Sequence, residues 1–384
     1  MKRNPFCFGE VVTGEHFTNR INEIKRLTLE LGGGNNIFLI SPRRYGKTSL
    51  IMNVLGHLKT EGFLTFYLDL YKVASLRELL EAYSKGVARS CATKVERFSG
   101  FVKEFFPRLR PKVIIGTDGV PSIEIDIQLK ERELMESLEE VLDIPEQIAI
   151  KRKKPFVVAF DEFQEILNLD GERIEKMMRA CFQHHHHVAY VFAGSKRHLL
   201  NSMVSDPNRA FYKLGDIMNL KRIEPSEMIE FLRKQFVKGS VKVSDEVLEY
   251  ILEVSEDVPY NVQYFCHHLW NWSLETKRVE EEDVEEIMDN IIAELCIKDC
   301  FLRPSVNLGT NQHSRKILSR KMPLALPVKK KNLWLCLRKR ISLMLMGKRF
   351  PLTMFFLGSG SRRRWCPLFH KLFLDGLAKG ITTF

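Results

Sequence analysis

Residues 35–50, NNIFLISPRRYGKTSL, carry the most informative pattern of this chain for predicting its fold. The apolar run IFLI predicts a buried strand. Gly46-Lys47-Thr48 ends the following loop, and apolar residues at helical spacing then predict an amphipathic helix. The apolar positions of this helix are Leu50, Ile51, Val54, Leu55 and Leu58. A strand, a glycine-containing loop and a helix, in this order, form the setting in which loop amides and the positive end of a helix hold phosphate groups.

The loop departs at one position from the usual phosphate-binding pattern G-x-x-x-x-G-K-[S/T], because Ser41 stands where the first glycine is expected. Pro42 biases Ser41 toward an extended backbone, so we predict that the serine is tolerated. Gly46 would let the backbone approach the anion, Lys47 would reach the β- and γ-phosphates, and the Thr48 hydroxyl would bind Mg²⁺. The predicted nucleotide-binding positions in the loop are Ser41, Pro42, Arg43, Arg44, Tyr45, Gly46, Lys47, Thr48 and Ser49. An ordinary helix start with an exposed lysine is the alternative, and solvent exposure explains the two arginines equally well.

A second motif, PFVVAFDEFQEI at residues 155–166, ends an apolar strand in two adjacent acids. A carboxylate after such a strand can hold Mg²⁺ through water, and a neighbouring carboxylate can polarise the water that attacks the γ-phosphate. We therefore assign Asp161 to the metal and Glu162 to the catalytic base, which favours hydrolysis over transfer to another substrate. Acidic pairs at strand ends also cap helices, and this is the alternative.

A third apolar strand, VAYVFAG at residues 188–194, is followed by Ser195. In a sheet of this kind, a polar side chain at the end of the strand beside the two motif strands can sense the γ-phosphate. We predict this catalytic role for Ser195, with Lys196 and Arg197 near it. An ordinary turn at Gly194-Ser195 is the alternative.

Strands that are apolar throughout and alternate with helices predict an α/β fold, with a parallel sheet covered by helices on both faces. A further buried strand is expected within residues 63–70. A helix at residues 18–31 should precede the sheet, because apolar residues recur on one face. These residues are Ile21, Ile24, Leu27 and Leu31.

Two segments fall outside this alternation. The residues around Asp118-Gly119 alternate in polarity, which predicts a hairpin insertion near residues 112–129. From residue 224 to about residue 295 only helical periodicity is present, with Ser244 as a predicted N-cap.

Six segments keep the order of the motifs of a known family. They are FTNRINEIKRL (17–27), LISPRRYGKTSLI (39–51), VVAFDEFQEI (157–166), YVFAGSKRHLL (190–200), RAFYKLG (209–215) and VPYNVQYFCHHLW (258–270). Over about residues 5–295 the chain resembles the ATPase domains first grouped as predominantly archaeal and also widespread in bacteria, which are related to AAA+ and STAND nucleotide-binding proteins. The resemblance implies an ASCE-type P-loop NTPase core, a small helical lid and, in typical members, a winged-helix domain.

The resemblance also implies positions for residues outside the loop. Asn19 and Arg20 would lie near the adenine end of the nucleotide site, and Pro259 would face the nucleotide from the lid. Arg209 is similar in position to residues that contact phosphate from a lid or a neighbouring subunit, although a structural surface arginine is equally compatible. The predicted domains are a P-loop ATPase core at residues 1–223, a helical lid at 224–297 and a basic tail of uncertain fold at 298–384.

Charge is segregated along the chain. Residues 301–384 contain eighteen Lys or Arg and a single acid, Asp375, whereas the first 300 residues carry 41 basic and 47 acidic groups. Such a segment is either a basic tail that binds nucleic acid, with aromatic side chains interleaved for stacking, or a non-native end left by a reading-frame change. We favour the frame change, because the family resemblance ends where the charge shift begins.

The sequence also bears on membrane targeting and on metal binding. The N-terminus carries no signal-peptide pattern and no stretch reaches about 18 uncharged apolar residues, so we expect a cytoplasmic protein that does not enter a membrane. A metal site in the run His184–His187 is not favoured, because successive residues point in different directions.

We predict ATP binding and Mg²⁺-dependent ATP hydrolysis, coupled to a conformational change that acts on a protein or nucleic-acid partner. One alternative is a nucleotide-held switch or scaffold with little turnover, and another is a DNA-associated ATPase. The protein partner is not identified by the sequence, and assembly into an oligomer is left open.

Overall fold

The computed structural model describes residues 3–14, 17, 20–91, 101, 104–105, 110–115, 121–126, 131–301, 356–357 and 364–365. The chain divides into two compact units. The larger unit comprises residues 7–231 and 258–260, and the smaller comprises residues 1–6, 232–257 and those from 261 onward. The domain limits expected from the sequence, 1–223, 224–297 and 298–384, stay predictions.

A five-stranded sheet forms the centre of the larger unit. Its strands lie in the order β2 (Leu64–Asp69), β5 (Phe156–Asp161), β6 (Val188–Gly194), β1 (Ile37–Ile40) and β7 (Asp216–Asn219). All neighbouring strands are parallel, with Asp69 opposite Asp161 and Ile40 opposite Gly194. The three strands that carry the sequence motifs are therefore adjacent, and their carboxyl ends meet at one edge of the sheet.

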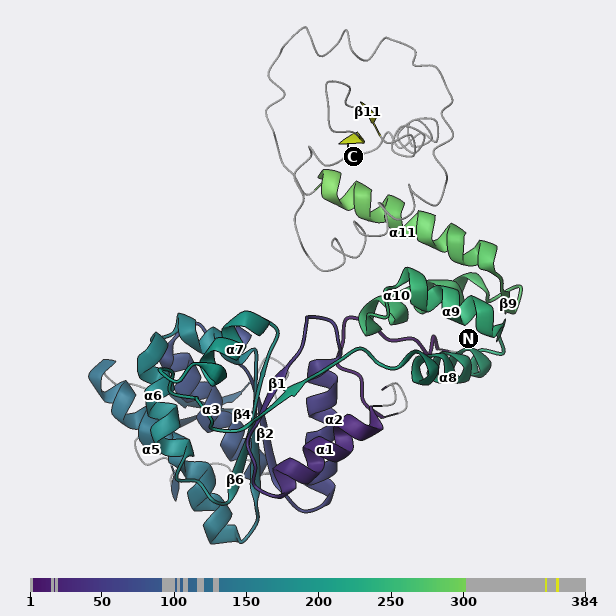
Figure 1. Cartoon of the computed structure of the whole chain (residues 1–384). Coiled ribbons are helices and arrows are strands. Elements are labelled where there is room, and N and C mark those ends of the chain that lie inside the picture. Colours follow the sequence, from purple (N-terminus) through teal and green to yellow (C-terminus); the bar gives the residue numbers. More distant parts are fainter. Residues whose placement is uncertain are drawn as a thin grey trace, which may run out of the picture. The chain divides into compact units, whose positions relative to one another are not determined.

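Helices cover both faces of this sheet, which confirms the predicted α/β fold. Figure 1 places α1 (Ile21–Gly32) and α2 (Lys47–Thr60) on one side, and α3 (Leu76–Cys91), α5 (Glu131–Arg152) and α6 (Gly171–Phe182) on the other. Every residue of β1, β5 and β6 is buried as a result. The five apolar positions predicted for the helix after the loop are all buried in α2.

Aromatic rings join the central strands across the core. The Phe192 ring on β6 lies 4.8 Å from the Phe38 ring on β1 and 5.9 Å from the Phe160 ring on β5, measured between centroids. The Phe160 and Phe192 rings are inclined by only 3°. Stacking between neighbouring strands thus reinforces the register of the strands that precede the motifs.

The edges of the sheet differ from the sequence expectation. The strand predicted to be buried within residues 63–70 is β2, which lies at an edge and has only two fully buried residues, Phe66 and Leu68. The opposite edge, β7, was not predicted from the sequence. Ile21 was expected on the buried face of the first helix but is 62% exposed, because that helix begins at Ile21 and the sheet covers its later turns.

Two short strands flank the predicted Asp118-Gly119 turn. β3 (Arg110–Ile115) and β4 (Pro121–Asp126) pair antiparallel, with Ile115 opposite Pro121. They form a two-stranded sheet separate from the main one. The Asp118-Gly119 turn itself lies outside the described residues.

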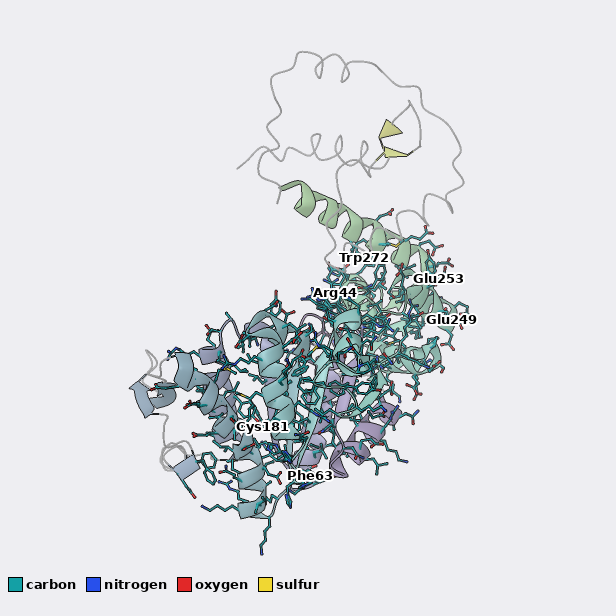
Figure 2. The ribbon with its side chains drawn as sticks, turned by 60° about the vertical axis from the view of Figure 1, so that its left-hand side comes forward. Arg44, Phe63, Cys181, Glu249, Glu253 and Trp272 are labelled. Carbon is teal, nitrogen blue, oxygen red and sulfur yellow. The ribbon has the colours of Figure 1, made fainter. Side chains whose placement is uncertain are left out.

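Residues 225–301 are mainly helical. Its elements are α8 (Pro225–Lys238), β8 (Lys242–Val243), α9 (Asp245–Val254), α10 (Pro259–Trp272), β9 (Arg278–Val279) and α11 (Glu281–Phe301). The parallel pair of β8 and β9 was missed by the sequence reading, which expected helices only. Ser244 caps α9 as predicted, since its side chain accepts from the Val247 amide. Figure 2 labels Glu249 and Glu253 on the exposed face of this helix.

α11 extends to Phe301, so the predicted boundary at residue 297 falls within this helix. Beyond it the structure describes β10 (Phe356–Leu357) and β11 (Arg364–Trp365), which pair antiparallel. The rest of the predicted basic tail lies outside the described residues. In the described part of the chain, no helix is long and apolar enough to cross a membrane.

Candidate functional site

The loop between β1 and α2 has two residues in the left-handed region. Arg44 has φ 70° and Gly46 has φ 80°. Ser41 does not have a positive φ. Its position, where the usual pattern has the first glycine, therefore does not need the conformational freedom of glycine. Ser41 is instead buried against β6, where its amide donates to the Gly194 carbonyl oxygen at 3.3 Å.

The loop directs α2 toward the carboxyl edge of the sheet. Gly46 is the N-cap of α2, and no side chain of the described residues caps the helix there. The first turn holds no acidic residue either. Unpaired amides at a helix N-terminus favour a negatively charged ligand. In Figure 2, Arg44 in this loop and Phe63, which precedes β2, lie at opposite ends of the larger unit.

Residues from the first turn of α2, from the end of β5 and from the position after β6 meet at this edge. They are Lys47, Thr48, Asp161, Glu162 and Ser195, here called the strand-edge cluster. Lys47 Nζ pairs with Asp161 and lies 3.1 Å from Glu162 Oε1. Thr48 Oγ1 donates to Asp161 Oδ2 at 2.5 Å, and Ser195 Oγ donates to Glu162 Oε2 at 2.7 Å. The structure therefore brings together all of the residues predicted to be catalytic or to bind metal.

The surroundings of Glu162 favour its charged form. Burial alone would raise the pKa of this carboxyl group, but the Lys47 charge and hydrogen bonds from Gln164 and Ser195 outweigh that effect. The pKa of Glu162 consequently lies below its ordinary value. The group is thus a carboxylate near neutral pH.

Two contacts of the cluster were missed by sequence reasoning. Tyr67 on β2 donates its hydroxyl to Asp161 Oδ2 at 3.1 Å, and burial together with the nearby carboxylates raises the pKa of Tyr67. Gln164 Nε2 donates to Glu162 Oε2 at 2.6 Å. No local pattern marks Tyr67, whose contact depends on β2 lying beside β5. Gln164 stands within the acidic motif, where a polar residue between Phe163 and Ile166 was the available signal.

Arg20 is linked to the backbone of the loop. Its side chain is 2% exposed, and Nη2 donates to the carbonyl oxygens of Tyr45 and Lys221 at 3.0 and 3.1 Å. Nη1 pairs with Glu23 at 2.8 Å. Through these contacts Arg20 links the backbone of the loop to the segment that follows β7. The adenine position implied for Arg20 stays a prediction, and Asn19 lies outside the described residues.

The remaining loop residues have different environments. Arg43 is exposed, and Tyr45 is buried in the core. The Ser49 hydroxyl accepts from the Val12 amide at 3.1 Å, which ties the N-terminal segment to α2. Pro42 is half-buried, and its carbonyl oxygen accepts from Ser41 Oγ at 3.1 Å.

Arg44 contacts the first turn of α10 within the larger unit. Its guanidinium lies 4.6 Å from the centroid of the Tyr260 ring, a cation–π contact. The Tyr260 amide also donates to the Arg44 carbonyl oxygen at 3.4 Å. Tyr260 follows Pro259, the residue implied to face the nucleotide.

Arg209 and the histidine run have structural contacts. Arg209 pairs with Glu175, a residue of α6 that is 1% exposed. This matches the reading of Arg209 as a structural arginine, and a contact with phosphate stays a prediction. His185 lies between Tyr190 OH at 2.6 Å and Asp143 Oδ1 at 2.9 Å. Among the described residues, no group of three or more His, Cys, Asp and Glu side chains has an arrangement that could hold a metal ion.

The strand-edge cluster suits a phosphate ester with Mg²⁺. A hydroxyl and a carboxylate, Thr48 Oγ1 and Asp161 Oδ2, point at each other, and both are hard oxygen donors of the kind Mg²⁺ prefers. Lys47 supplies a positive charge at the N-terminus of α2, which no side chain of the described residues caps. A Cβ built on Gly46 would have no atom within 4 Å, so open space adjoins the loop there. The strand-edge cluster therefore has side chains suited to both a phosphate group and Mg²⁺.

Comparison with known proteins places these features in a wider group. A family described as an ATPase domain predominantly from Archaea matches residues 17–265, more than half of the chain. The Walker-type ATPase of Pyrococcus abyssi is similar in structure, with a TM-score of 0.54 and 16% identity over 96% of this chain and 99% of that one. The ORC1 protein of Aeropyrum pernix, solved in complex with DNA, has a TM-score of 0.50 and 12% identity over 94% of each chain. Identities this low show a common fold alone. None of the curated proteins compared with the chain matches it.

Proposed function

The chain belongs to the family of ATPase domains found predominantly in Archaea and is a nucleotide-binding ATPase; we propose that the strand-edge cluster binds ATP with Mg²⁺ and hydrolyses it. One observation carries this proposal. A lysine and a threonine at a helix start meet two carboxylates and a serine from neighbouring strands at one sheet edge.

Each part of the cluster would have a distinct task in binding. The free amides of α2 and the Lys47 ammonium group would hold the phosphates. Thr48 and Asp161 would hold Mg²⁺, with Tyr67 keeping the Asp161 carboxylate in place. When bound, Mg²⁺ offsets negative charge on the phosphate oxygens.

Glu162 would be the catalytic base. As a carboxylate it can orient water and accept a proton while the water oxygen attacks the γ-phosphorus and the bond to the β-phosphate oxygen breaks. Ser195 holds one oxygen of this carboxylate at 2.7 Å and stands at the end of the strand between the two motif strands. This position supports its proposed role near the γ-phosphate.

The test is to separate binding from turnover. Glu162→Gln is expected to lower kcat by about 10²- to 10⁴-fold, the usual contribution of a general base, while ATP affinity changes little. Lys47→Ala is expected to weaken ATP binding itself, and chelation of Mg²⁺ should stop turnover of the wild type. Steady-state phosphate release and ATP titration provide the two measurements.

Glu172→Gln is the matched control, since Glu172 is an exposed acid in the first turn of α6 that pairs with Lys176 at 3.4 Å. It should retain nearly wild-type turnover. Undiminished turnover by Glu162→Gln would contradict the assignment. A wild type that binds ATP but has no turnover under any partner condition would favour the nucleotide-held switch or scaffold.

We further propose that ATP turnover is coupled to a conformational change acting on a partner. Arg44 belongs to the loop and contacts Tyr260 at the first turn of α10 through both its side chain and its carbonyl oxygen. Rearrangement of the loop around phosphate would therefore strain or release this contact. A protein partner, assembly into an oligomer and action in the cytoplasm are proposals that rest on the sequence alone.

The charge pattern favours a second candidate, a DNA-associated ATPase. Residues 301–384 carry eighteen basic groups and one acid, a balance suited to a phosphate backbone. This candidate requires DNA to stimulate turnover or to bind in a salt-sensitive manner, and the effect must disappear in a chain that ends at residue 301. Persistence of DNA stimulation in the shortened chain would place the DNA contact elsewhere.

A further inference from the structure

Glu162 has a backbone conformation that residues with side chains rarely adopt. Its φ of 50° and ψ of 43° lie in the left-handed region. A residue other than glycine keeps such a conformation only when its surroundings hold it there. The contacts of Glu162 should therefore reveal what holds this residue in place.

Three donors contact the Glu162 carboxylate, and two of them share one oxygen. Gln164 Nε2 and Ser195 Oγ lie 2.6 and 2.7 Å from Oε2. Lys47 Nζ lies 3.1 Å from the other oxygen, Oε1. Oε2 is thus anchored from two sides, while Oε1 faces the lysine that would contact phosphate.

The Gln164 side chain has a defined orientation. It is 1% exposed, and besides Glu162 its Nε2 lies 3.4 Å from Glu165 Oε1. Both neighbours are carboxylate oxygens, so the amide nitrogen must face them, because a flipped amide would bring oxygen against oxygen. Gln164 Oε1 has no hydrogen-bond partner among the described residues, which indicates that the contact with Glu162 determines the orientation.

Gly194 provides the space that Gln164 occupies. A Cβ built on Gly194 would lie 2.3 Å from Gln164 Oε1 and 3.1 Å from Leu200 Cδ2. Gly194 does not have a positive φ, so this position needs glycine for room and not for conformational freedom. The Gln164 side chain therefore fits only because Gly194, the last residue of β6, has no side chain.

We propose that Gln164 is a positioning residue for Glu162, holding the carboxylate toward Lys47 in a site that Gly194 leaves open for the amide. The inference rests on the proposed role of Glu162 as catalytic base. It adds a residue that acts through Glu162 without contacting the nucleotide. Loss of the amide would let the carboxylate rotate away, so turnover would fall while nucleotide affinity stayed the same.

Gln164→Met tests the hydrogen bond separately from the packing, because methionine has similar volume and no donor. We expect kcat to fall by about ten- to a hundredfold, the equivalent of one hydrogen bond to a charged group, with an unchanged Kd for ATP. The control is Asn168→Ala in the same segment, since Asn168 is exposed and donates to Glu165 at 2.6 Å. The control should leave kcat within about twofold of the wild type.

The comparison of kcat with the Kd for ATP provides a readout that a purely structural role would not give. A general disturbance of the site would weaken ATP binding together with turnover, whereas loss of one donor to the Glu162 carboxylate should lower kcat alone. A Kd for ATP that rises in parallel with the fall in kcat would count against positioning.

A double-mutant cycle tests the match with Gly194. Gly194→Ala should displace the amide and lower kcat by about tenfold in the wild-type background, but by less than about twofold together with Gln164→Ala, which leaves room for the added methyl group. If the effects of the two substitutions on kcat were additive, Gly194 and Gln164 would not be coupled. Wild-type kcat for Gln164→Met, alongside an inactive Glu162→Gln, would overturn the positioning role and leave the proposed function intact. Wild-type kcat for Glu162→Gln would instead overturn the proposed function.

Discussion

The loop shows which glycine of a phosphate-binding pattern is required in this chain. Gly46 has φ 80° at the start of α2, whereas Ser41 lies on the sheet side of the loop without a positive φ. A side chain in the left-handed region costs about 1–2 kcal/mol. The serine therefore carries no conformational penalty, and the conformational requirement falls on Gly46.

This difference predicts opposite outcomes for two substitutions. Gly46→Ala should weaken ATP binding about tenfold or more, because the strained backbone would shift the amides of α2. Ser41→Gly should keep the Kd for ATP within about threefold, since only one local hydrogen bond to Pro42 is lost. Titration of a fluorescent ATP analogue measures both, and equal losses would contradict the conformational argument.

Arg20 connects three elements of the larger unit. It precedes α1, its Nη2 group reaches the loop carbonyl of Tyr45, and the same group reaches the carbonyl of Lys221, which follows β7. A buried guanidinium with all of these acceptors fixes the loop against the sheet edge. Its removal would leave the Tyr45 and Lys221 carbonyl groups without this donor, and the first of these lies in a buried contact.

Arg20→Ala should therefore lower the free energy of unfolding by about 3 kcal/mol, measured by urea denaturation. Arg26→Ala is the control, because Arg26 pairs with Asp216 at the surface, where both side chains are about half exposed. Loss of that surface pair should cost less than about 1 kcal/mol. Similar destabilisation by both variants would show that Arg20 contributes no more to stability than a surface arginine does.

The charge of the whole chain is concentrated in one segment. The first 300 residues are slightly acidic, and residues 301–384 hold a large basic excess. If the basic segment binds DNA, each neutralised phosphate releases condensed counterions, and affinity falls steeply with salt, with a slope of about −0.9 per phosphate contacted on a double-logarithmic plot. Measuring this slope for the full chain and for a chain ending at residue 301 should give a steep and a flat dependence, respectively.

The reading-frame hypothesis predicts a different outcome for the same segment. In that case the full chain and the shortened chain should have equal ATPase activity and equal, weak DNA affinity. Translation of the other frames of the coding DNA should then reveal a winged-helix-like sequence. Its absence from those frames would exclude the hypothesis.

The central strands, the order of the motifs and the residues of the strand-edge cluster were predictable from local sequence pattern. Buried parallel strands are continuous apolar runs. Asp161 ends one such run, Ser195 directly follows another, and Lys47 begins the helix after the loop that follows a third, so local pattern was sufficient to predict that they meet. The partial exposure of β2 and the existence of β7 could not be predicted from local pattern. An edge strand has only one neighbour, and its burial depends on which strand it joins.

The contacts that hold the predicted residues in place became visible in the folded structure alone. Tyr67 reaches Asp161 because β2 lies beside β5, and Arg20 reaches Lys221 across 201 positions of sequence. Gln164 and Gly194 are matched because the segment after β5 folds against the end of β6. Hydrogen-bond partners distant in sequence are set by strand order and side-chain packing, which no local periodicity encodes.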